Sequence, residues 1–216
     1  MDINVSMQTP LDGHKQRRGQ TRARLIAAAR TVMGQKGADA VPISDITDAA
    51  GLGKGSFYNH FSSREELIEA VFEETVTELG SEIQSLGESM DDPAERLAFT
   101  IRYAMTRSLE DEETARFFVR GDSGRGMIGR HIEPSGWRDV HHGMASGRFQ
   151  CDDLGVLGAI IAGGSEAIMR GVIEGELSSS ESISGLAGSV LILLGINAQE
   201  AKAIANQALP VSNLEQ

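Results

Sequence analysis

Apolar residues recur along this chain three and four positions apart, and strict alternation of apolar and polar residues is rare. The first spacing is that of an amphipathic helix and the second is that of a strand, so the pattern predicts an all-α protein. In the first third of the chain an apolar stripe contains Leu25, Ala29, Val32 and Met33. The pattern predicts three helices there, over residues 21–35, 43–50 and 54–61.

A long helix is predicted next, over residues 64–88. Ser63 has the residue type of an N-cap, and Glu66 three positions later completes a capping box. Pro93 is suited to the first turn of a further helix, which extends to about residue 108. For the rest of the chain we expect a short helix at 112–120, a loop at 121–135, and two long final helices at 153–174 and 182–207.

The second and third helices are joined by Gly51-Leu52-Gly53, which gives the pair the dimensions of a helix-turn-helix. Gly51 can adopt the left-handed conformation that ends a helix. Gly53 is an acceptable N-cap for the helix that follows. Apolar residues of the motif would form a small core with the first helix packed across it: Ile43, Ile46, Ala50, Leu52, Phe57 and Phe61.

The charge is divided unequally along the chain. The net charge is −11, but residues 1–64 carry nine Lys and Arg against five Asp and Glu, a balance of +4. Residues 65–216 carry 11 against 26, a balance of −15. A basic end on an acidic body suits a protein that meets a polyanion at that end only.

The predicted third helix has an outward face without a carboxylate. Its polar groups can approach phosphates without repulsion and offer donors to base edges in the major groove. The sequence therefore predicts sequence-specific binding of double-stranded DNA through this face: Lys54, Gly55, Ser56, Tyr58, Asn59 and His60.

The run from Gly51 to Leu67, GLGKGSFYNHFSSREEL, resembles the signature of the TetR family of bacterial regulators. Residues 21–29, Asp45-Ile46 and Gly147-Arg148-Phe149 also fit the family pattern. The resemblance implies an all-α homodimer in which a three-helix head is joined by a long helix to a C-terminal ligand-binding and dimerisation body. The expected divisions are a flexible basic tail (1–19), a DNA-binding domain (20–65), a body (66–210) and a tail (211–216).

Carried over by position, the resemblance implies that each head places its third helix in a major groove of a palindromic operator. The expected phosphate contacts are Lys54, Tyr58, His60 and Arg64. The remaining expected contacts are Ser56 and Asn59 to bases, Gly55 by close backbone approach, and Ser44 to a phosphate or base. Pro42, Thr47 and Gly53 depart from the family pattern.

Several of these assignments have alternatives. Tyr58 would otherwise be a partly buried packing residue, and His60 would be a simply exposed side chain. Lys54 and Arg64 would otherwise be solvated surface charges. The basic run from His14 to Arg18 would either enter a neighbouring minor groove or remain a disordered tail that adds nonspecific attraction.

The resemblance also implies a small-molecule cavity in the body. An effector would bind the conformation in which the two heads of the dimer are spaced wrongly for the operator. The bound effector would thereby shift the population away from the DNA-binding conformation. We identify few polar residues as candidates to line this cavity, so we expect an apolar or aromatic effector. The candidates are Tyr103, Met105, Phe117, Phe118, Met127, Trp137 and His141, each of which could instead fill the core.

The last two helices are the expected dimer interface. Four glycines in the first of them would let backbones approach closely, and each costs about 0.5–1 kcal/mol within a helix. The candidates are Val156, Ile160, Gly164, Ala167, Leu186, Val190 and Leu194. The alternative is an antiparallel pair internal to one chain.

Other functions find less support in the sequence. Gly124-Arg125-Gly126-Met127-Ile128-Gly129 matches a dinucleotide-binding pattern, but no strand is predicted before it. No His, Cys or carboxylate set has metal-ligand spacing, so we expect no metal, no cofactor and no enzymatic activity. The lone Cys151, the polar N-terminus and the lack of a long apolar run indicate a cytoplasmic protein without a membrane span. The expected function is a ligand-responsive repressor. An activator, and a helical enzyme or scaffold with a silent helix-turn-helix, are the alternatives.

Overall fold

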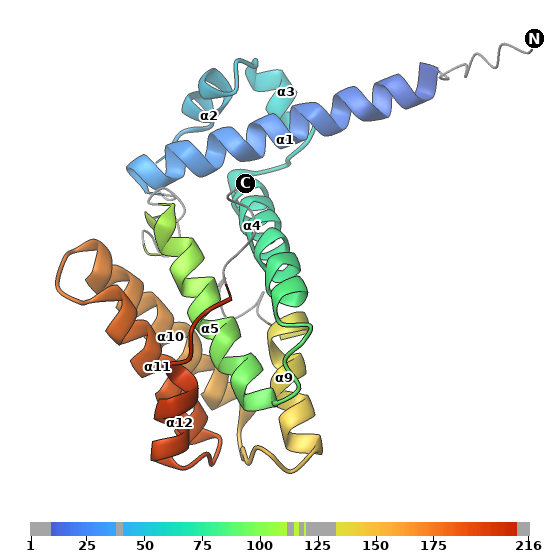
Figure 1. The fold of residues 1–216 in the computed structure, drawn as a ribbon. Coiled ribbons are helices and arrows are strands. Elements are labelled where there is room, and N and C mark those ends of the chain that lie inside the picture. The colour runs from blue at the N-terminus through green and yellow to red at the C-terminus, as the bar shows by residue number, and fades with distance from the viewer. Residues whose placement is uncertain (1–9, 38–40, 112–114, 117–118, 120–132, 211–216) are drawn as a thin grey trace, which may run out of the picture.

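A computed structural model describes residues 10–37, 41–111, 115–116, 119 and 133–210, and within these residues all regular structure is helical. Three helices form a head at one end of the molecule: α1 (Pro10–Lys36), α2 (Ile43–Ala49) and α3 (Lys54–Tyr58). A fourth helix, α4 (Arg64–Leu86), leads from the head into a helical body (Figure 1). The predicted architecture of head, linking helix and body is confirmed.

The head is built around side chains that are fully removed from solvent. Leu25, Ile26 and Met33 of α1 face Ile46 of α2 and Phe57 of α3, and each of these five is 0% exposed. Phe61, just beyond α3, is 2% exposed, and its ring centroid lies 5.7 Å from that of Phe57. The two short helices α2 and α3 can hold a fixed arrangement because they share this one core with α1.

The turn between α2 and α3 has the geometry that its two glycines predict. Gly51 has a φ of +63°, in the left-handed region that favours glycine. Gly53 is the N-cap of α3 in an extended conformation. The backbone N–H of Leu52 donates to the carbonyl of Thr47 at 2.8 Å, and the Leu52 side chain packs partly buried on the core.

The start of α4 contains the predicted N-cap, with one difference. The Ser63 hydroxyl accepts a hydrogen bond from the Glu66 backbone N–H at 3.2 Å. The Glu66 carboxylate, however, accepts from both the backbone N–H and the hydroxyl of Ser62, each at 2.6 Å, rather than from Ser63. These bonds lower the pKa of Glu66, the hydroxyl of Ser62 having the largest effect.

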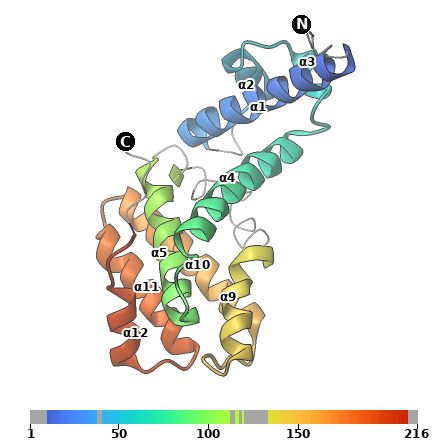
Figure 2. The same cartoon turned by 45° about the vertical axis from the view of Figure 1, so that its right-hand side comes forward.

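The body surrounds α5 (Pro93–Glu110), whose Leu97, Ala98 and Ile101 are buried. In both views α9 (Glu133–Ala145) lies on one side of α5, and α11 (Ser179–Leu193) and α12 (Ala198–Ala205) lie on the other (Figures 1 and 2). The remaining helix, α10 (Leu154–Ile173), packs against α11.

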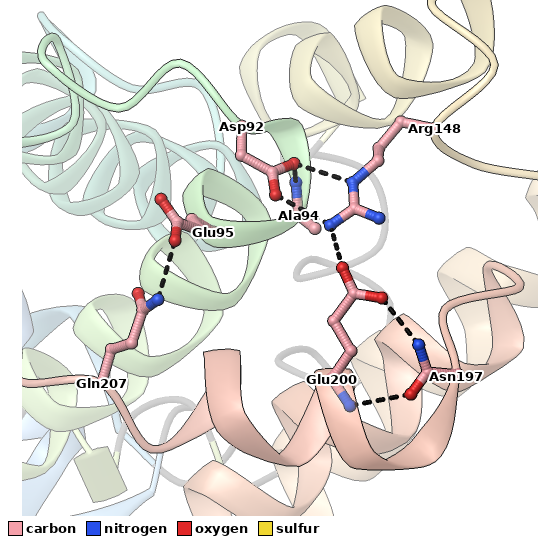
Figure 3. A network of polar contacts seen from close by, with 7 residues as sticks. All are labelled: Asp92, Ala94, Glu95, Arg148, Asn197, Glu200 and Gln207. Atoms are coloured by element: carbon pink, nitrogen blue, oxygen red, sulfur yellow. Dashed lines mark hydrogen bonds and ion pairs between the residues drawn. The ribbon is translucent and has the colours of Figure 1, made fainter.

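A polar network ties three parts of the body together at the end away from the head. The Arg148 guanidinium donates to both carboxylate oxygens of Asp92, at 3.0 and 2.8 Å, and to Glu200 of α12 at 2.5 Å (Figure 3). Asp92 also caps α5 through the Ala94 N–H, and Asn197 caps α12 through the Glu200 N–H. The hydrogen bonds from Arg148 hold the pKa of Asp92 below its usual value.

The helix boundaries differ from the prediction in three places. First, α1 begins at Pro10, so residues 10–20, most of which we assigned to a flexible tail, are helical. Residues 16–20 are exposed, and apolar periodicity reports only on a helix that buries one face. The remaining part of that expected tail, residues 1–9, lies outside the described residues.

Second, α9 occupies a segment where we expected a loop up to residue 135 and named no helix. Its sequence includes Pro134, Gly136 and Gly143, which are poor helix formers. Tertiary packing accounts for one of them, because any side chain at Gly143 would clash with the Phe149 ring. The prediction of a short helix at 112–120 is only partly testable: Ala115, Arg116 and Val119 are helical, and the rest lies outside the described residues.

Third, the single final helix predicted over residues 182–207 is two helices. Gly195 has a φ of +90°, which ends α11, and Asn197 caps α12 by accepting from the Glu200 N–H at 2.9 Å. The apolar spacing continues through this corner because residues on both sides of it face the same core: Val190, Leu194, Ile196 and Ala201 are all buried.

Candidate nucleic-acid interface

Helix α3 presents polar side chains outward over an aromatic anchor. Phe57 is fully buried, whereas its neighbour Tyr58 is 62% exposed. Lys54, Gly55 and Asn59 are also exposed. This arrangement fixes the backbone of α3 while leaving its outer face free to contact a partner.

Glycine at position 55 has no explanation in the packing of the head. A Cβ built there meets nothing within 4 Å, and the residue has an ordinary helical conformation. A side chain would therefore fit within the protein itself. The absence of one leaves room for close approach by something outside the chain, as expected for a helix inserted in a groove.

One of the two acidic residues of α2 is paired with a lysine of α1. The Asp45 carboxylate accepts a hydrogen bond from the Lys36 ammonium at 2.7 Å, and this bond lowers the pKa of Asp45. The half-buried Ser44 hydroxyl lies 3.4 Å from the same carboxylate. The buried Thr47 hydroxyl donates to the Ser44 carbonyl at 3.0 Å. Thr47 departs from the family pattern, but its hydroxyl therefore has a hydrogen-bond partner within α2.

Arginines of α1 border the helix-turn-helix. Arg24 donates to the Ala50 carbonyl at 2.6 Å, and Arg18 donates to the Asn59 carbonyl at 3.4 Å. Both carbonyls lie at helix C-termini, where the backbone dipoles favour a positive charge. The Arg22 guanidinium lies 5.4 Å from the centroid of the Phe61 ring. From the sequence, Arg18 was expected only as part of the basic run from His14, and Arg22 and Arg24 had no expected role, although Arg18 and Arg22 are four positions apart on one helix face.

Two of the expected phosphate contacts, His60 and Arg64, have charged neighbours. His60 is half-buried, and its pKa is lowered first by burial and then by the positive charges of Arg18 and Arg22. The lowered pKa favours the neutral imidazole, which has one N–H donor and no charge. Arg64, at the first residue of α4, lies 3.7 Å from the Glu65 carboxylate.

The described candidates for effector binding lie on two helices, α5 and α9. Tyr103 and Met105 are both buried on α5, but residues two apart on a helix do not face each other. Trp137 is half-buried on α9 close to Gly158 of α10, and His141 is exposed. The Tyr103 hydroxyl donates to Glu82 of α4 at 3.0 Å. Phe117, Phe118 and Met127 lie outside the described residues.

A buried carboxylate in the body was missed by the sequence analysis. Asp139 of α9 is 8% exposed, and it is the one buried carboxylate among the residues whose burial is described. Arg96 of α5 lies 2.9 Å from it, and Arg138 donates to the Gln84 side chain of α4. Burial raises the pKa of Asp139 despite the opposing charges of Arg96, Arg138 and His142. The only sequence signal is an acidic residue beside Trp137 and Val140.

The candidate dimer residues fall into two groups. Val156 is 55% exposed and Ile160 is 40% exposed on α10, where Ala167 is exposed as well. Val190 and Leu194, in contrast, are buried among the helices of their own chain and leave no side-chain surface for a partner. The exposed large apolar residues of α11 are Ile192 and Leu193. Gly164 lies beneath the half-buried Leu186, so a Cβ there would come within 2.8 Å of its methyl carbon.

Known proteins resemble both parts of this chain. Residues 25–71 match the family model of bacterial regulatory proteins, tetR family, and residues 92–207 match that of the tetracyclin repressor-like C-terminal domain. The transcriptional repressor KstR2 of Mycolicibacterium smegmatis is 33% identical over 76 residues, which are 35% of this chain and 37% of KstR2. The transcriptional activator FasR of the same species is 29% identical over 110 residues, or 51% of this chain and 50% of FasR. The chain thus matches half or less of these relatives' length.

Solved structures extend the similarity to nearly the whole chain. RolR in complex with resorcinol is 35% identical, with a TM-score of 0.76 over 91% of this chain and 98% of RolR. FadR from Bacillus subtilis in complex with stearoyl-CoA is 21% identical with a TM-score of 0.62 over 81% of this chain and 99% of FadR, and shares the fold. The head, the linking helix and the body therefore all have counterparts in one group of proteins, and the chain belongs to the tetR family of bacterial regulatory proteins.

Proposed function

We propose that this protein is a sequence-specific transcriptional repressor that binds a palindromic operator and leaves it when a small molecule occupies the body. The observation that carries DNA binding is the outer face of α3, which has no acidic residue and is held in place by the buried Phe57. Repression is proposed over activation because KstR2, named a repressor, is more similar in sequence than FasR, named an activator.

In this proposal Lys54, Tyr58, His60 and Arg64 contact phosphates. Ser56 and Asn59 face bases, and Gly55 lets the backbone of α3 approach the groove. Ser44 contacts a phosphate or base from the start of α2. Exposure of Lys54, Gly55, Tyr58 and Asn59 supports this division of roles.

We propose that a second copy of the chain covers the apolar side of α10 and α11. Over its 20 residues α10 has a mean hydropathy of 1.5, high enough for a membrane span by length and composition, yet only 28% of that stretch is buried within the chain. Its exposed residues include Val156 and Ile160, and α11 adds Ile192 and Leu193. A second copy would remove this surface from water and provide two heads for a palindrome.

We propose that the effector is a small hydroxylated aromatic molecule bound near Asp139. RolR, which shares 35% of its sequence with this chain, has been solved with resorcinol. A buried carboxylate beside guanidinium groups offers both an acceptor and donors for a phenol, and the half-buried Trp137 two residues away offers an aromatic surface. Because the carboxylate sits between α5 and α9 and Arg138 reaches α4, a ligand there would contact the helix that leads to the head.

Selection from a random duplex library, followed by anisotropy titration at two salt concentrations, tests DNA binding. The wild type should enrich a palindrome. Lys54→Ala should lower affinity about 3- to 10-fold and reduce the salt slope by about 1, with the same sequence preference. Asn59→Ala should instead change the preferred bases. The control is Lys202→Ala, which removes an exposed charge from α12. No enriched sequence, or Lys54→Ala binding like wild type, would contradict the proposal.

The effector proposal has its own readout, because Trp137 is the single tryptophan. Resorcinol should change the fluorescence of Trp137 and release the selected duplex, and benzene should do neither at the same concentration. Asp139→Asn should weaken resorcinol binding at least tenfold, whereas Asp152→Asn, an exposed acid, should not. Equal responses to benzene and resorcinol would refute recognition through hydroxyl groups.

A further inference from the structure

The N-terminal part of α1 extends beyond the head as a basic helix. Residues 16–20 are exposed, and Figure 1 shows this end of α1 projecting past α3. In Figure 2 the same end lies on the α3 side of the head, away from the body. The segment therefore contributes little to the core, and its helical structure and its charge need another explanation.

The arginines of this segment form two rows along α1. Arg18 and Arg22, four residues apart, lie on one face, and Arg17 and Arg24, seven residues apart, lie on a neighbouring one. The first row faces the end of α3, because Arg18 reaches the Asn59 carbonyl and Arg22 lies over Phe61. The second row leads to α2, because Arg24 reaches the Ala50 carbonyl. Both rows thus begin beside the helix-turn-helix and continue outward.

The outer arginines of these rows form no close ion pair, although the charge of Arg22 contributes to the lowered pKa of Glu66. Among the described residues, none of the ion pairs includes Arg17, Arg18 or Arg22. The acidic residues of the chain are concentrated instead in residues 65–216, which carry 26 Asp and Glu. The depressed pKa of His60, to which Arg18 and Arg22 contribute, is consistent with a positive potential at this edge of the head.

We propose that residues 16–22 of α1 form a helical arm that binds the phosphates of double-stranded DNA beside the groove entered by α3. This rests on the proposed function of α3, and it extends the binding surface to DNA that flanks each half-site. A helix fixes the guanidinium groups before DNA arrives, so less conformational entropy is lost on binding than with a flexible tail. The contacts are to phosphates, and they increase affinity without selecting a sequence.

The first test removes charge from the arm in the full-length chain. The double variant Arg17→Gln/Arg18→Gln should bind the selected duplex about tenfold more weakly at low salt, and the slope of log affinity against log salt should become shallower by about 2. The ratio of affinities for the selected and scrambled duplexes should stay unchanged. Lys202→Gln, on the exposed surface of α12, is the control for loss of charge alone.

The second test keeps every charge and breaks the helix. Gly19 lies within α1, and a Cβ there meets nothing within 4 Å. Gly19→Pro should interrupt the arm and weaken binding as the double variant does, whereas Gly19→Ala should favour the helix and bind at least as tightly as wild type. Thermal unfolding should be alike for all these variants, because the substituted residues lie outside the core.

The outcomes separate the arm from the function on which it depends. If the double variant keeps wild-type affinity and salt slope while Lys54→Ala weakens binding, the arm is refuted and α3 still binds DNA. If the double variant is weak but Gly19→Pro binds like wild type, the basic residues act as a flexible tail and the helical arm is refuted. If the wild-type protein binds no duplex, both proposals fail.

Discussion

Phe57 and Tyr58 are adjacent aromatic residues with opposite environments. The Phe57 side chain is fully buried, and the Tyr58 side chain is 62% exposed, with their rings in edge-to-face contact at 5.2 Å. The hydroxyl group explains the difference in part, because a buried phenol requires a hydrogen-bond partner and an exposed one can offer a donor to a phosphate. Position on the helix decides the rest, since Phe57 and Phe61 are four residues apart and face the same core.

At the residue scale, Asp139 makes stability depend on pH. Burial raises its pKa in the folded protein above the ordinary value of 3.8, so above that pH the folded state binds more protons than the unfolded chain. The contribution of Asp139 to the free energy of unfolding is therefore fully favourable below 3.8 and declines as the pH rises through the raised pKa. Asp139→Asn removes this decline, so the variant should gain stability relative to wild type as the pH rises above 3.8.

Urea unfolding of both proteins at several pH values measures this difference. The groups facing Asp139 are Arg96, Arg138 and His142, and their charges oppose the effect of burial. Asp152→Asn is the matched control because Asp152 is exposed. A difference between Asp139→Asn and wild type that is constant over the whole pH range would show that burial does not govern this carboxyl group.

At the element scale, side chains complete the hydrogen bonding at the ends of the helices. Ser63 caps α4, Asp92 caps α5, Asp153 caps α10 and Asn197 caps α12, each by accepting a backbone N–H. Arginines from other elements bind the opposite ends of α2 and α3. The N-terminal caps involve residues close together in the chain and can be predicted from the sequence. The arginine contacts, in contrast, join residues 26 and 41 positions apart.

The corner between α11 and α12 gives a prediction at this scale. Gly195 has a φ of +90°, so Gly195→Ala should strain the corner and destabilise the protein by roughly 1–2 kcal/mol. Gly185 lies within α11 with a helical conformation and open space at its Cβ position. Gly185→Ala should therefore be neutral or stabilise the protein by up to about 1 kcal/mol.

Equilibrium urea unfolding at one fixed protein concentration compares the two variants, because association would make stability depend on concentration. Destabilisation by both substitutions to the same extent would mean that the corner is not held in the left-handed conformation. A shift in midpoint without a change in slope would show that the variants unfold in the same way as wild type.

At the scale of the whole molecule, the chain separates a basic head from an acidic body and leaves an apolar side on α10 and α11. The separation of charge directs DNA to the head and away from the body. The apolar side, which includes Val156, Ile160, Ile192 and Leu193, is the surface that we propose a second copy covers.

Ile160→Arg should therefore convert the protein to a monomer, because a charge would be buried in the proposed interface. Light scattering at micromolar concentration should report half the wild-type mass, and affinity for a palindrome should fall more than affinity for a single half-site. Ala203→Arg, on the exposed surface of α12, should leave the mass unchanged. A wild-type protein that is already monomeric, or an Ile160→Arg variant that remains a dimer, would contradict the proposed pairing.

The sequence by itself determined the features that depend on near neighbours in the chain. Apolar spacing predicted the helices of the head, the glycines at 51 and 53 predicted the turn, and Ser63 predicted the start of α4. These features follow from hydrogen bonding and backbone conformation within a few residues. The outward face of α3 was readable for the same reason, because the period of a helix fixes which residues point away from Phe57.

Only the tertiary structure decided which distant residues meet. It placed Arg18 and Arg24 at the ends of α3 and α2, buried Asp139 beside Arg96, and joined Arg148 to Asp92 and Glu200. It also buried Val190 and Leu194 and left Ile192 and Leu193 exposed. A run of apolar residues shows that a helix buries one face, but it does not specify which of the other helices packs on that face. The packing of all of them together determines which residues remain for DNA, for an effector or for a second chain.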